Sequence, residues 1–129
     1  MSTPHAIADW LHTCNARRLC TDSRQVAAGD AFIAWPGYAS DARAYVGQAV
    51  KAGAVAVLVE ADALADSGLS PAMQSDPRVR AVRGLKAMAG PIAATFYGDP
   101  SAAMEVIAVT GTNGKTSIAW WLSQALRVR

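Results

Sequence analysis

The residues with the clearest chemical capacity form one short segment near the end of the chain, Gly111-Thr112-Asn113-Gly114-Lys115-Thr116-Ser117. Its glycines allow backbone N–H groups to approach a phosphate closely, and a helix that starts directly after them adds the positive end of its dipole. Lys115 supplies a full charge that can reach the β- and γ-phosphates, and the Thr116 hydroxyl is the kind of group that binds Mg²⁺ in such loops. The spacing predicts a nucleotide-phosphate site at residues 111–117, with Lys115 as its catalytic charge and Thr116 as its metal ligand.

The segments on both sides of this loop have the pattern that a phosphate site requires. Residues 105–110 form an apolar run typical of a strand, and apolar residues recur at helical spacing from Ile118 to Leu126. The commonest form of the motif has a further glycine where this chain has Val109. The alternative is a strand-to-helix turn that uses glycine for geometry alone, but the register of Lys115 and Thr116 favours the phosphate site.

The rest of the chain alternates predicted helices and strands, which is typical of an α/β fold with a parallel sheet. Thr3 and Pro4 predict the start of a first helix, as its N-cap and first residue. The continuous apolar run at 54–59 predicts a strand covered on both faces. Because Gly90-Pro91 lies inside a helical stripe, the helix over 85–96 is expected to kink or to start there. The other predicted segments are strands at 19–21, 31–35 and 78–81, a helix at 45–50 and a loop at 67–77.

A segment rich in glycine, aspartate and proline, Gly98 to Ser101, separates these elements from the phosphate loop. We therefore expect a first domain at residues 1–98, a linker at 99–103 and the start of a second domain at 104–129.

Length and composition exclude several classes of protein. The 129 residues leave room for about one domain, and 52% of them are hydrophobic, which is enough to build a core. A net charge of +2 is too small for nucleic-acid binding, and no apolar run reaches the length of about 18 residues that a membrane span needs. The first residues lack the features of a secretory signal. We therefore expect no nucleic-acid partner, no membrane partner and a cytoplasmic location, with Cys14 and Cys20 as reduced thiols.

The segment Val109 to Ser117 resembles the ATP loop of the Mur ligases, the ATP-dependent amide ligases of peptidoglycan synthesis. Upstream, Thr21 to Val26 and Gly29 to Ala34 resemble the N-terminal uridine-nucleotide domain of that family, as do Gly37-Tyr38 and Gly53-Ala54. The resemblance covers nearly the whole chain. It implies a small uridine-nucleotide-binding domain, followed by the first strand, phosphate loop and helix of a truncated ATPase domain.

The resemblance also implies which residues contact the uridine-diphosphate end of the substrate: Thr21, Ser23, Tyr38, Ala39 and Ser40. Ser23 has a physical argument of its own, because a hydroxyl after a strand end can donate to a phosphate or carbonyl oxygen. An ordinary Asp-Ser turn is an equally good interpretation of Ser23 when the resemblance is set aside.

The resemblance implies ATP and Mg²⁺ as cofactors, with a UDP-N-acetylmuramoyl-dipeptide and an amino acid, expected to be meso-diaminopimelate, as substrates. A substrate carboxylate would attack the γ-phosphate of ATP, and an amine would then attack the acyl phosphate. Lys115 and the loop amides would stabilise charge on the transferring phosphoryl group. Family chains carry further Mg²⁺ ligands, a modified lysine and a C-terminal domain later in their sequences. We therefore expect residues 1–129 to be inactive alone, and monomeric.

Two alternatives stay open. The chain could belong to the family member that adds D-Ala-D-Ala, or it could be a stand-alone module that binds a uridine nucleotide and catalyses nothing.

Overall fold

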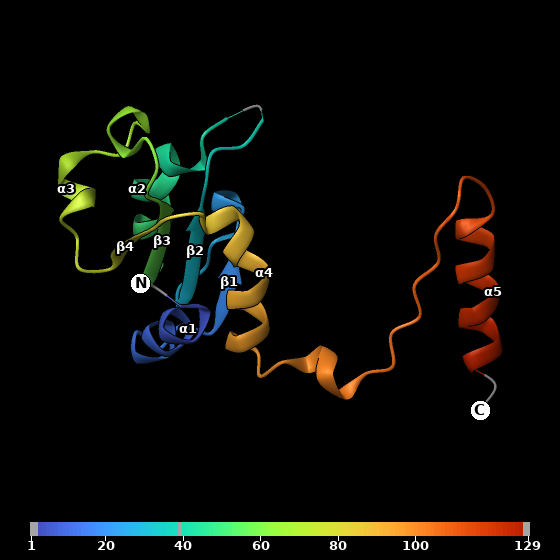
Figure 1. Ribbon diagram of the computed structural model, residues 1–129. Coiled ribbons are helices and arrows are strands. Elements are labelled where there is room, and N and C mark those ends of the chain that lie inside the picture. The colour runs from blue at the N-terminus through green and yellow to red at the C-terminus, as the bar shows by residue number, and fades with distance from the viewer. Residues whose placement is uncertain (1–2, 39, 128–129) are drawn as a thin grey trace.

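The computed structural model describes residues 3–38 and 40–127, and its N-terminal part folds around one parallel sheet (Figure 1). Its four strands lie in sequence order, and every neighbouring pair is parallel. The two central strands are buried along their whole length, as in a sheet that is covered on both faces. The strands are β1 (Arg18–Cys20), β2 (Asp30–Ala34), β3 (Ala56–Glu60) and β4 (Val79–Val82).

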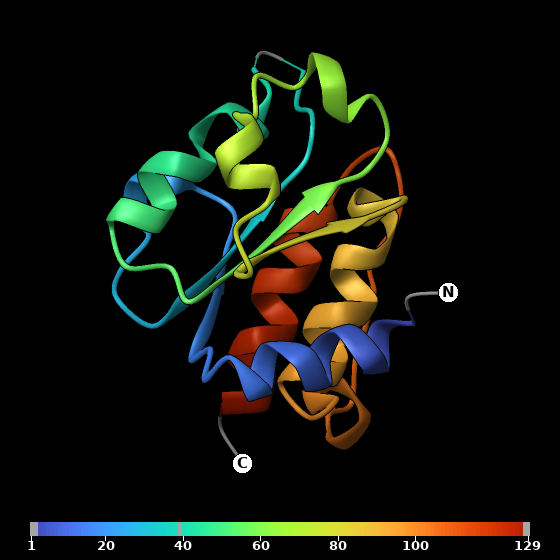
Figure 2. The same cartoon turned by 90° about the vertical axis from the view of Figure 1, so that its left-hand side faces the viewer.

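Helices cover the two faces of the sheet, and Figure 2 shows the resulting layers. Helices α1 (Pro4–Thr13) and α4 (Leu85–Phe96) pack on one face, against Ile33 of β2 and Leu58 of β3. Helices α2 (Val46–Lys51) and α3 (Pro71–Gln74) lie on the other face. Because α2 and α3 each connect two adjacent parallel strands, right-handed crossovers bring them to the same face.

Several sequence predictions are confirmed in this part of the chain. The side chain of Thr3 caps α1 by accepting a hydrogen bond from the Ala6 N–H at 3.2 Å, and Pro4 is the first helical residue. Most of the apolar run at 54–59 lies in the buried strand β3, which continues to Glu60. The predicted strand at 78–81 corresponds to β4, which lies at an edge of the sheet and is exposed along part of its length.

Two local predictions differ from the structure. Of the two outcomes expected for the helix over 85–96, a start at Gly90-Pro91 is wrong, because α4 begins at Leu85 and runs through Pro91. Gly90 and Pro91 are exposed, and the carbonyl that loses its partner there can be hydrated. The predicted loop at 67–77 contains α3, whose N-cap Ser70 accepts a hydrogen bond from the Met73 N–H at 3.3 Å. A capping residue followed by Pro71 predicts such a start, but four helical residues are too few to show periodicity.

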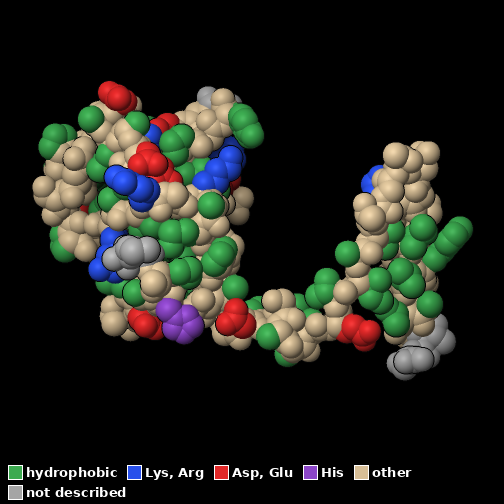
Figure 3. All heavy atoms as spheres, viewed as in Figure 1, with side chains coloured by type: hydrophobic (Ala, Val, Ile, Leu, Met, Phe, Trp, Pro, Cys, Tyr) green, Lys and Arg blue, Asp and Glu red, His purple; other side chains and the backbone are tan. Residues whose placement is uncertain are grey.

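The C-terminal segment differs most from its prediction. The strand expected at 105–110 is absent, because no strand among the described residues lies beside it to pair with its backbone groups. The helix predicted after the glycine loop is confirmed as α5 (Lys115–Arg127). In Figure 1, α5 stands apart from the sheet. We call the described residues 104–127 the C-terminal arm, and Figure 3 shows hydrophobic side chains along it. Trp120 and Trp121 are 60% and 64% exposed. No helix in residues 3–38 or 40–127 is long and apolar enough to cross a membrane.

Candidate functional site

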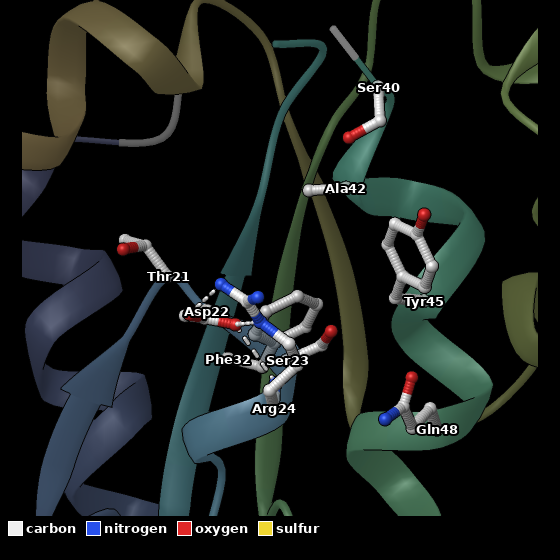
Figure 4. A pocket seen from close by; sticks show the side chains of 9 residues that line it. All are labelled: Thr21, Asp22, Ser23, Arg24, Phe32, Ser40, Ala42, Tyr45 and Gln48. Atoms are coloured by element: carbon white, nitrogen blue, oxygen red, sulfur yellow. Dashed lines mark hydrogen bonds and ion pairs between the residues drawn. The ribbon is translucent and has the colours of Figure 1, made fainter.

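A cavity of about 560 Å³ opens at the carboxyl edge of the sheet, where β1 and β2 end (Figure 4). In parallel α/β sheets, ligands bind beyond the carboxyl ends of the strands. The turn after β1, the loop after β2 and the segment leading into α2 each contribute one wall. The lining residues are Thr21 to Arg24, Phe32, Ser40, Ala42, Tyr45 and Gln48.

The first wall is a turn that Asp22 holds in place. Its carboxylate accepts hydrogen bonds from the Arg24 backbone N–H at 3.0 Å and from Nε and Nη2 of the same residue at 2.9 and 2.7 Å. Asp22 thereby caps a 3₁₀ turn at Ser23–Gln25 and presents Ser23, which is half-buried, to the cavity. The hydrogen bonds from Arg24 lower the pKa of Asp22 from 3.8 to about 2, so this carboxylate is ionised at neutral pH.

The second wall is a hairpin formed by residues 35–42. The Gly37 N–H donates to the Ser40 carbonyl at 2.9 Å, and the Ala42 N–H donates to the Trp35 carbonyl at 3.3 Å. A Cβ atom at residue 37 would lie 2.9 Å from the Ser40 carbonyl oxygen, so only glycine fits this close approach. The hairpin brings Ser40 and Ala42 to the cavity, opposite the turn that carries Ser23 (Figure 4).

The third wall carries two polar side chains that the sequence analysis did not identify. Tyr45 immediately precedes α2 and Gln48 lies in its first turn, three residues later, and both face the turn after β1 in Figure 4. Gln48 is exposed, and its side-chain amide is available to a ligand at this wall. Phe32, which is fully buried, forms an apolar surface between the walls. The spacing of Tyr45 and Gln48 was a usable signal, because polar residues among the apolar positions of a helix mark its exposed face.

The structure brings together three of the five residues expected to bind the uridine nucleotide. Thr21, Ser23 and Ser40 line the same cavity. Tyr38 does not line it: its side chain is fully exposed, and the Lys86 ammonium lies 5.0 Å from the centre of its ring. Ala39 lies outside the described residues.

The glycine loop at 111–117 forms a second candidate site. Gly111 and Gly114 have φ values of +142° and +76°, which glycine adopts without strain. Helix α5 begins at Lys115, so the unpaired N–H groups of its first turn point toward the loop. The Lys115 ammonium donates to the carbonyls of Gly111 and, at 3.4 Å, Thr112. These features fit a phosphate group, since they place N–H donors and a cation on one short loop. The described residues contain no cluster of three or more His, Cys, Asp or Glu suited to a metal ion.

Comparison with known proteins gives consistent similarities. Residues 16–97, more than half of the chain, match the pattern described as "Mur ligase family, catalytic domain". A protein of Acidovorax sp. (strain JS42) is 48% identical over 126 residues, which are 98% of this chain and 24% of that protein. A protein of Pseudomonas aeruginosa is 46% identical over 110 residues, 85% of this chain and 22% of that protein. Both are named UDP-N-acetylmuramoyl-L-alanyl-D-glutamate--2,6-diaminopimelate ligase. The chain thus spans about a quarter of the length of the curated relatives it matches.

A solved structure shares the fold. The MurF ligase of Thermotoga maritima in complex with ADP superposes with a TM-score of 0.50 at 22% identity, over 67% of this chain and 18% of that one. At this identity the similarity supports the α/β architecture and nothing finer.

Proposed function

The chain belongs to the Mur ligase family, and we propose that it supplies the uridine-nucleotide-binding part of an ATP-dependent amide ligase of peptidoglycan synthesis. The proposed reaction adds meso-diaminopimelate to UDP-N-acetylmuramoyl-L-Ala-D-Glu. The names of the relatives favour this reaction over addition of D-Ala-D-Ala. The proposed cellular location is the cytoplasm.

One observation carries the proposal. Thr21 and Ser23 come from the turn after β1 and Ser40 from the loop after the neighbouring strand β2, and all three line one cavity at the carboxyl edge of the sheet. Three hydroxyls and the Gln48 amide can donate to or accept from the polar edge of a nucleoside and its diphosphate. Arg24, whose side chain is 83% exposed, adds a cation at the same wall. We therefore assign Thr21, Ser23 and Ser40 to the uridine nucleotide, and we retain Tyr38 and Ala39 as contacts that depend on the family resemblance.

The loop at 111–117 is proposed to hold the phosphates of ATP. Its backbone N–H groups and the Lys115 ammonium would bind the phosphate oxygens, and the Thr116 hydroxyl would be one ligand of Mg²⁺. The bound metal would neutralise charge on the γ-phosphate during transfer to a substrate carboxylate. Lys115 contributes by holding its charge beside the loop, where it now contacts the Gly111 and Thr112 carbonyls.

A boundary between two units near residue 98 also belongs to this proposal. Helix α4 ends at Phe96, and the family match ends at Tyr97. Gly98 and Asp99 both have positive φ values, and the described side chains from 104 to 127 are largely exposed. These observations support a unit at 1–98, a linker at 99–103 and a second unit that starts at 104.

Calorimetric titration of the 129-residue chain with UDP-N-acetylmuramoyl-L-Ala-D-Glu tests the proposal. We expect binding, and we expect Ser23→Ala to weaken it by about three- to tenfold, the effect of losing one or two hydrogen bonds. Ser75→Ala is the control, because Ser75 is exposed and lies outside the cavity. Absence of binding by the unaltered chain would overturn the proposed function.

A parallel assay separates the proposed ligase part from a stand-alone binding module. With ATP, Mg²⁺, the UDP-muramoyl dipeptide and diaminopimelate, residues 1–129 should release no phosphate in a substrate-dependent manner. Titration with ATP and Mg²⁺ then distinguishes the two interpretations. Binding of ATP that is lost in Lys115→Ala supports the ligase assignment, whereas binding of the uridine nucleotide alone favours the module.

A further inference from the structure

Arg43 is a buried cation that the proposed binding chemistry does not use. Its side chain is 4% exposed, and the residue directly follows the hairpin at 35–42 that forms one wall of the cavity. The Nε and Nη2 atoms donate to the Asp41 carboxylate at 2.7–3.0 Å. The Nη1 atom donates to the backbone carbonyls of Glu60, at 3.1 Å, and Asp62, at 2.6 Å. Burying a guanidinium is costly unless such partners satisfy it, so this arrangement needs an explanation.

The chain contains the same local turn three times, which supplies an internal comparison. In Asp22-Ser23-Arg24, Asp41-Ala42-Arg43 and Asp76-Pro77-Arg78, the aspartate accepts from the arginine backbone N–H at 2.9–3.0 Å and from its guanidinium. The side chains of Arg24 and Arg78 are 83% and 44% exposed, and within the described part of the chain both guanidiniums hydrogen-bond only inside their own turns. Among the three, Arg43 is the buried one, and it reaches a distant element. The turn therefore does not require burial, and the burial of Arg43 serves something outside it.

The contacts of Arg43 connect the end of β3 to the hairpin. Asp41 pairs with Pro36 in an isolated bridge at the base of the hairpin, and it caps the 3₁₀ turn at Ala42–Tyr45. The guanidinium joins Asp41 to the carbonyl of Glu60, the last residue of β3, and to the carbonyl of Asp62 beyond it. The hairpin is thereby fixed to the sheet through one side chain, with Ser40 and Ala42 on either side of Asp41 facing the cavity.

We propose that Arg43 is a positioning residue that fixes the hairpin on β3 so that Ser40 and Ala42 form one wall of the nucleotide cavity. This inference rests on the proposed function, since it concerns the same site. Lysine cannot replace Arg43 in this role. A single ammonium cannot present a planar fork to the carboxylate while reaching two carbonyls on the other side.

Three variants test the proposal: Arg43→Lys, the milder Asp41→Asn and the matched control Arg78→Lys. We expect Arg43→Lys and Asp41→Asn each to weaken binding of UDP-N-acetylmuramoyl-L-Ala-D-Glu by about tenfold, and Arg78→Lys to change it by less than about twofold. The two substitutions combined should weaken binding little more than either alone, because both break the same linkage. In ¹⁵N relaxation measurements on the free chain, Gly37, Ser40 and Ala42 should lose order in the first two variants only.

A purely structural role predicts a different result. If Arg43→Lys lowers the melting temperature but leaves the dissociation constant and the order of the hairpin amides as in Arg78→Lys, the proposal is overturned. If the unaltered chain does not bind the nucleotide, the proposed function fails, and relaxation alone decides the inference. In that case, hairpin amides that stay ordered in Arg43→Lys and Asp41→Asn contradict the positioning role of Arg43. Loss of order in these two variants but not in Arg78→Lys supports it.

Discussion

Ser23 illustrates how a single side chain in the site depends on its neighbours. The Asp-Ser turn and the nucleotide contact were alternative interpretations of this residue, but the structure contains the turn and also directs Ser23 to the cavity. Asp22 forms the turn with Arg24, and the side chain of the middle residue, Ser23, is left facing the cavity. The two interpretations are therefore compatible, because Asp22 and Arg24 make the turn while the Ser23 side chain faces the cavity.

The Asp22–Arg24 pair gives a prediction that depends on pH. The folded pKa of about 2 lies below the ordinary value of 3.8, so the pair stabilises the folded state fully above about pH 4. Its contribution is lost as the pH falls through 2. We expect the ¹³C carboxyl resonance of Asp22 to titrate near pH 2, and Arg24→Gln to move its pKa toward 3.8.

Asp76 provides the control for this titration, because hydrogen bonds from Arg78 also lower its pKa to about 2. Arg24→Gln should leave the titration of Asp76 unchanged, and Arg78→Gln should shift Asp76 alone. An Asp22 resonance that titrates near 4 in the unaltered chain would contradict the pairing.

The family resemblance pointed to Thr21, Ser23 and Ser40, and the structure places all three at one cavity. The resemblance could not identify Arg43 or place Tyr38. Whether an arginine is buried depends on what lies behind it, here carbonyls 17 and 19 residues further along the chain. The contact of Tyr38 is likewise with a distant residue, Lys86 of α4, which has no local signature in the sequence.

At the scale of elements, the junctions between strands and helices hold interactions that local sequence patterns cannot show. The buried carboxylate of Glu60 at the end of β3 accepts hydrogen bonds from the backbone N–H groups of Gly84, at 2.9 Å, and Leu85, at 2.7 Å. The carboxylate thereby satisfies two backbone N–H groups at the start of α4 and interacts favourably with the helix dipole. The apolar pattern predicted both elements, but the contact joins residues 24 and 25 positions apart and so has no local signature.

Gly53 marks another such junction and provides a prediction. It has a φ of +101°, and a Cβ atom there would lie 2.8 Å from the Ala28 Cα and 3.0 Å from its Cβ. We expect Gly53→Ala to lower the free energy of unfolding by about 1–3 kcal/mol, because it combines backbone strain with a clash. Equilibrium unfolding in urea measures the effect.

Gly47 is the matched control, because it lies inside α2 with open space around a Cβ atom. Gly47→Ala should raise the free energy of unfolding by up to about 1 kcal/mol, the difference in helix propensity. Equal effects of the two substitutions would show that the close approach to Ala28 is not maintained in solution.

At the scale of the whole molecule, the folded core and the C-terminal arm have opposite character. The core buries both faces of its sheet, whereas α5 has no buried residue and segment 105–110 forms no strand. The sequence predicted a strand there because its apolar residues match the pattern of one. A parallel strand also needs a neighbouring strand to pair with its backbone N–H and C=O groups, and an apolar sequence pattern does not show whether one is present. Local sequence information thus predicted α5 correctly, because a helix makes its backbone hydrogen bonds within itself. It failed for the strand, because a strand makes its backbone hydrogen bonds with a neighbouring strand.

This contrast predicts that the arm contributes little to the stability of the core. Removal of residues after Gly98 should leave the melting temperature within about 2 °C of that of the full chain, because the described residues beyond 103 bury almost no side chain. The uridine nucleotide should bind with an unchanged dissociation constant, since the cavity is lined by residues between Thr21 and Gln48. Truncation after Val82 is the control: it also removes α4, with the buried Leu85, Ile92 and Phe96, and should abolish cooperative unfolding. A drop of more than about 5 °C on the first truncation would show that the arm packs on the core in solution, since an independent arm shifts neither the enthalpy nor the entropy of core unfolding.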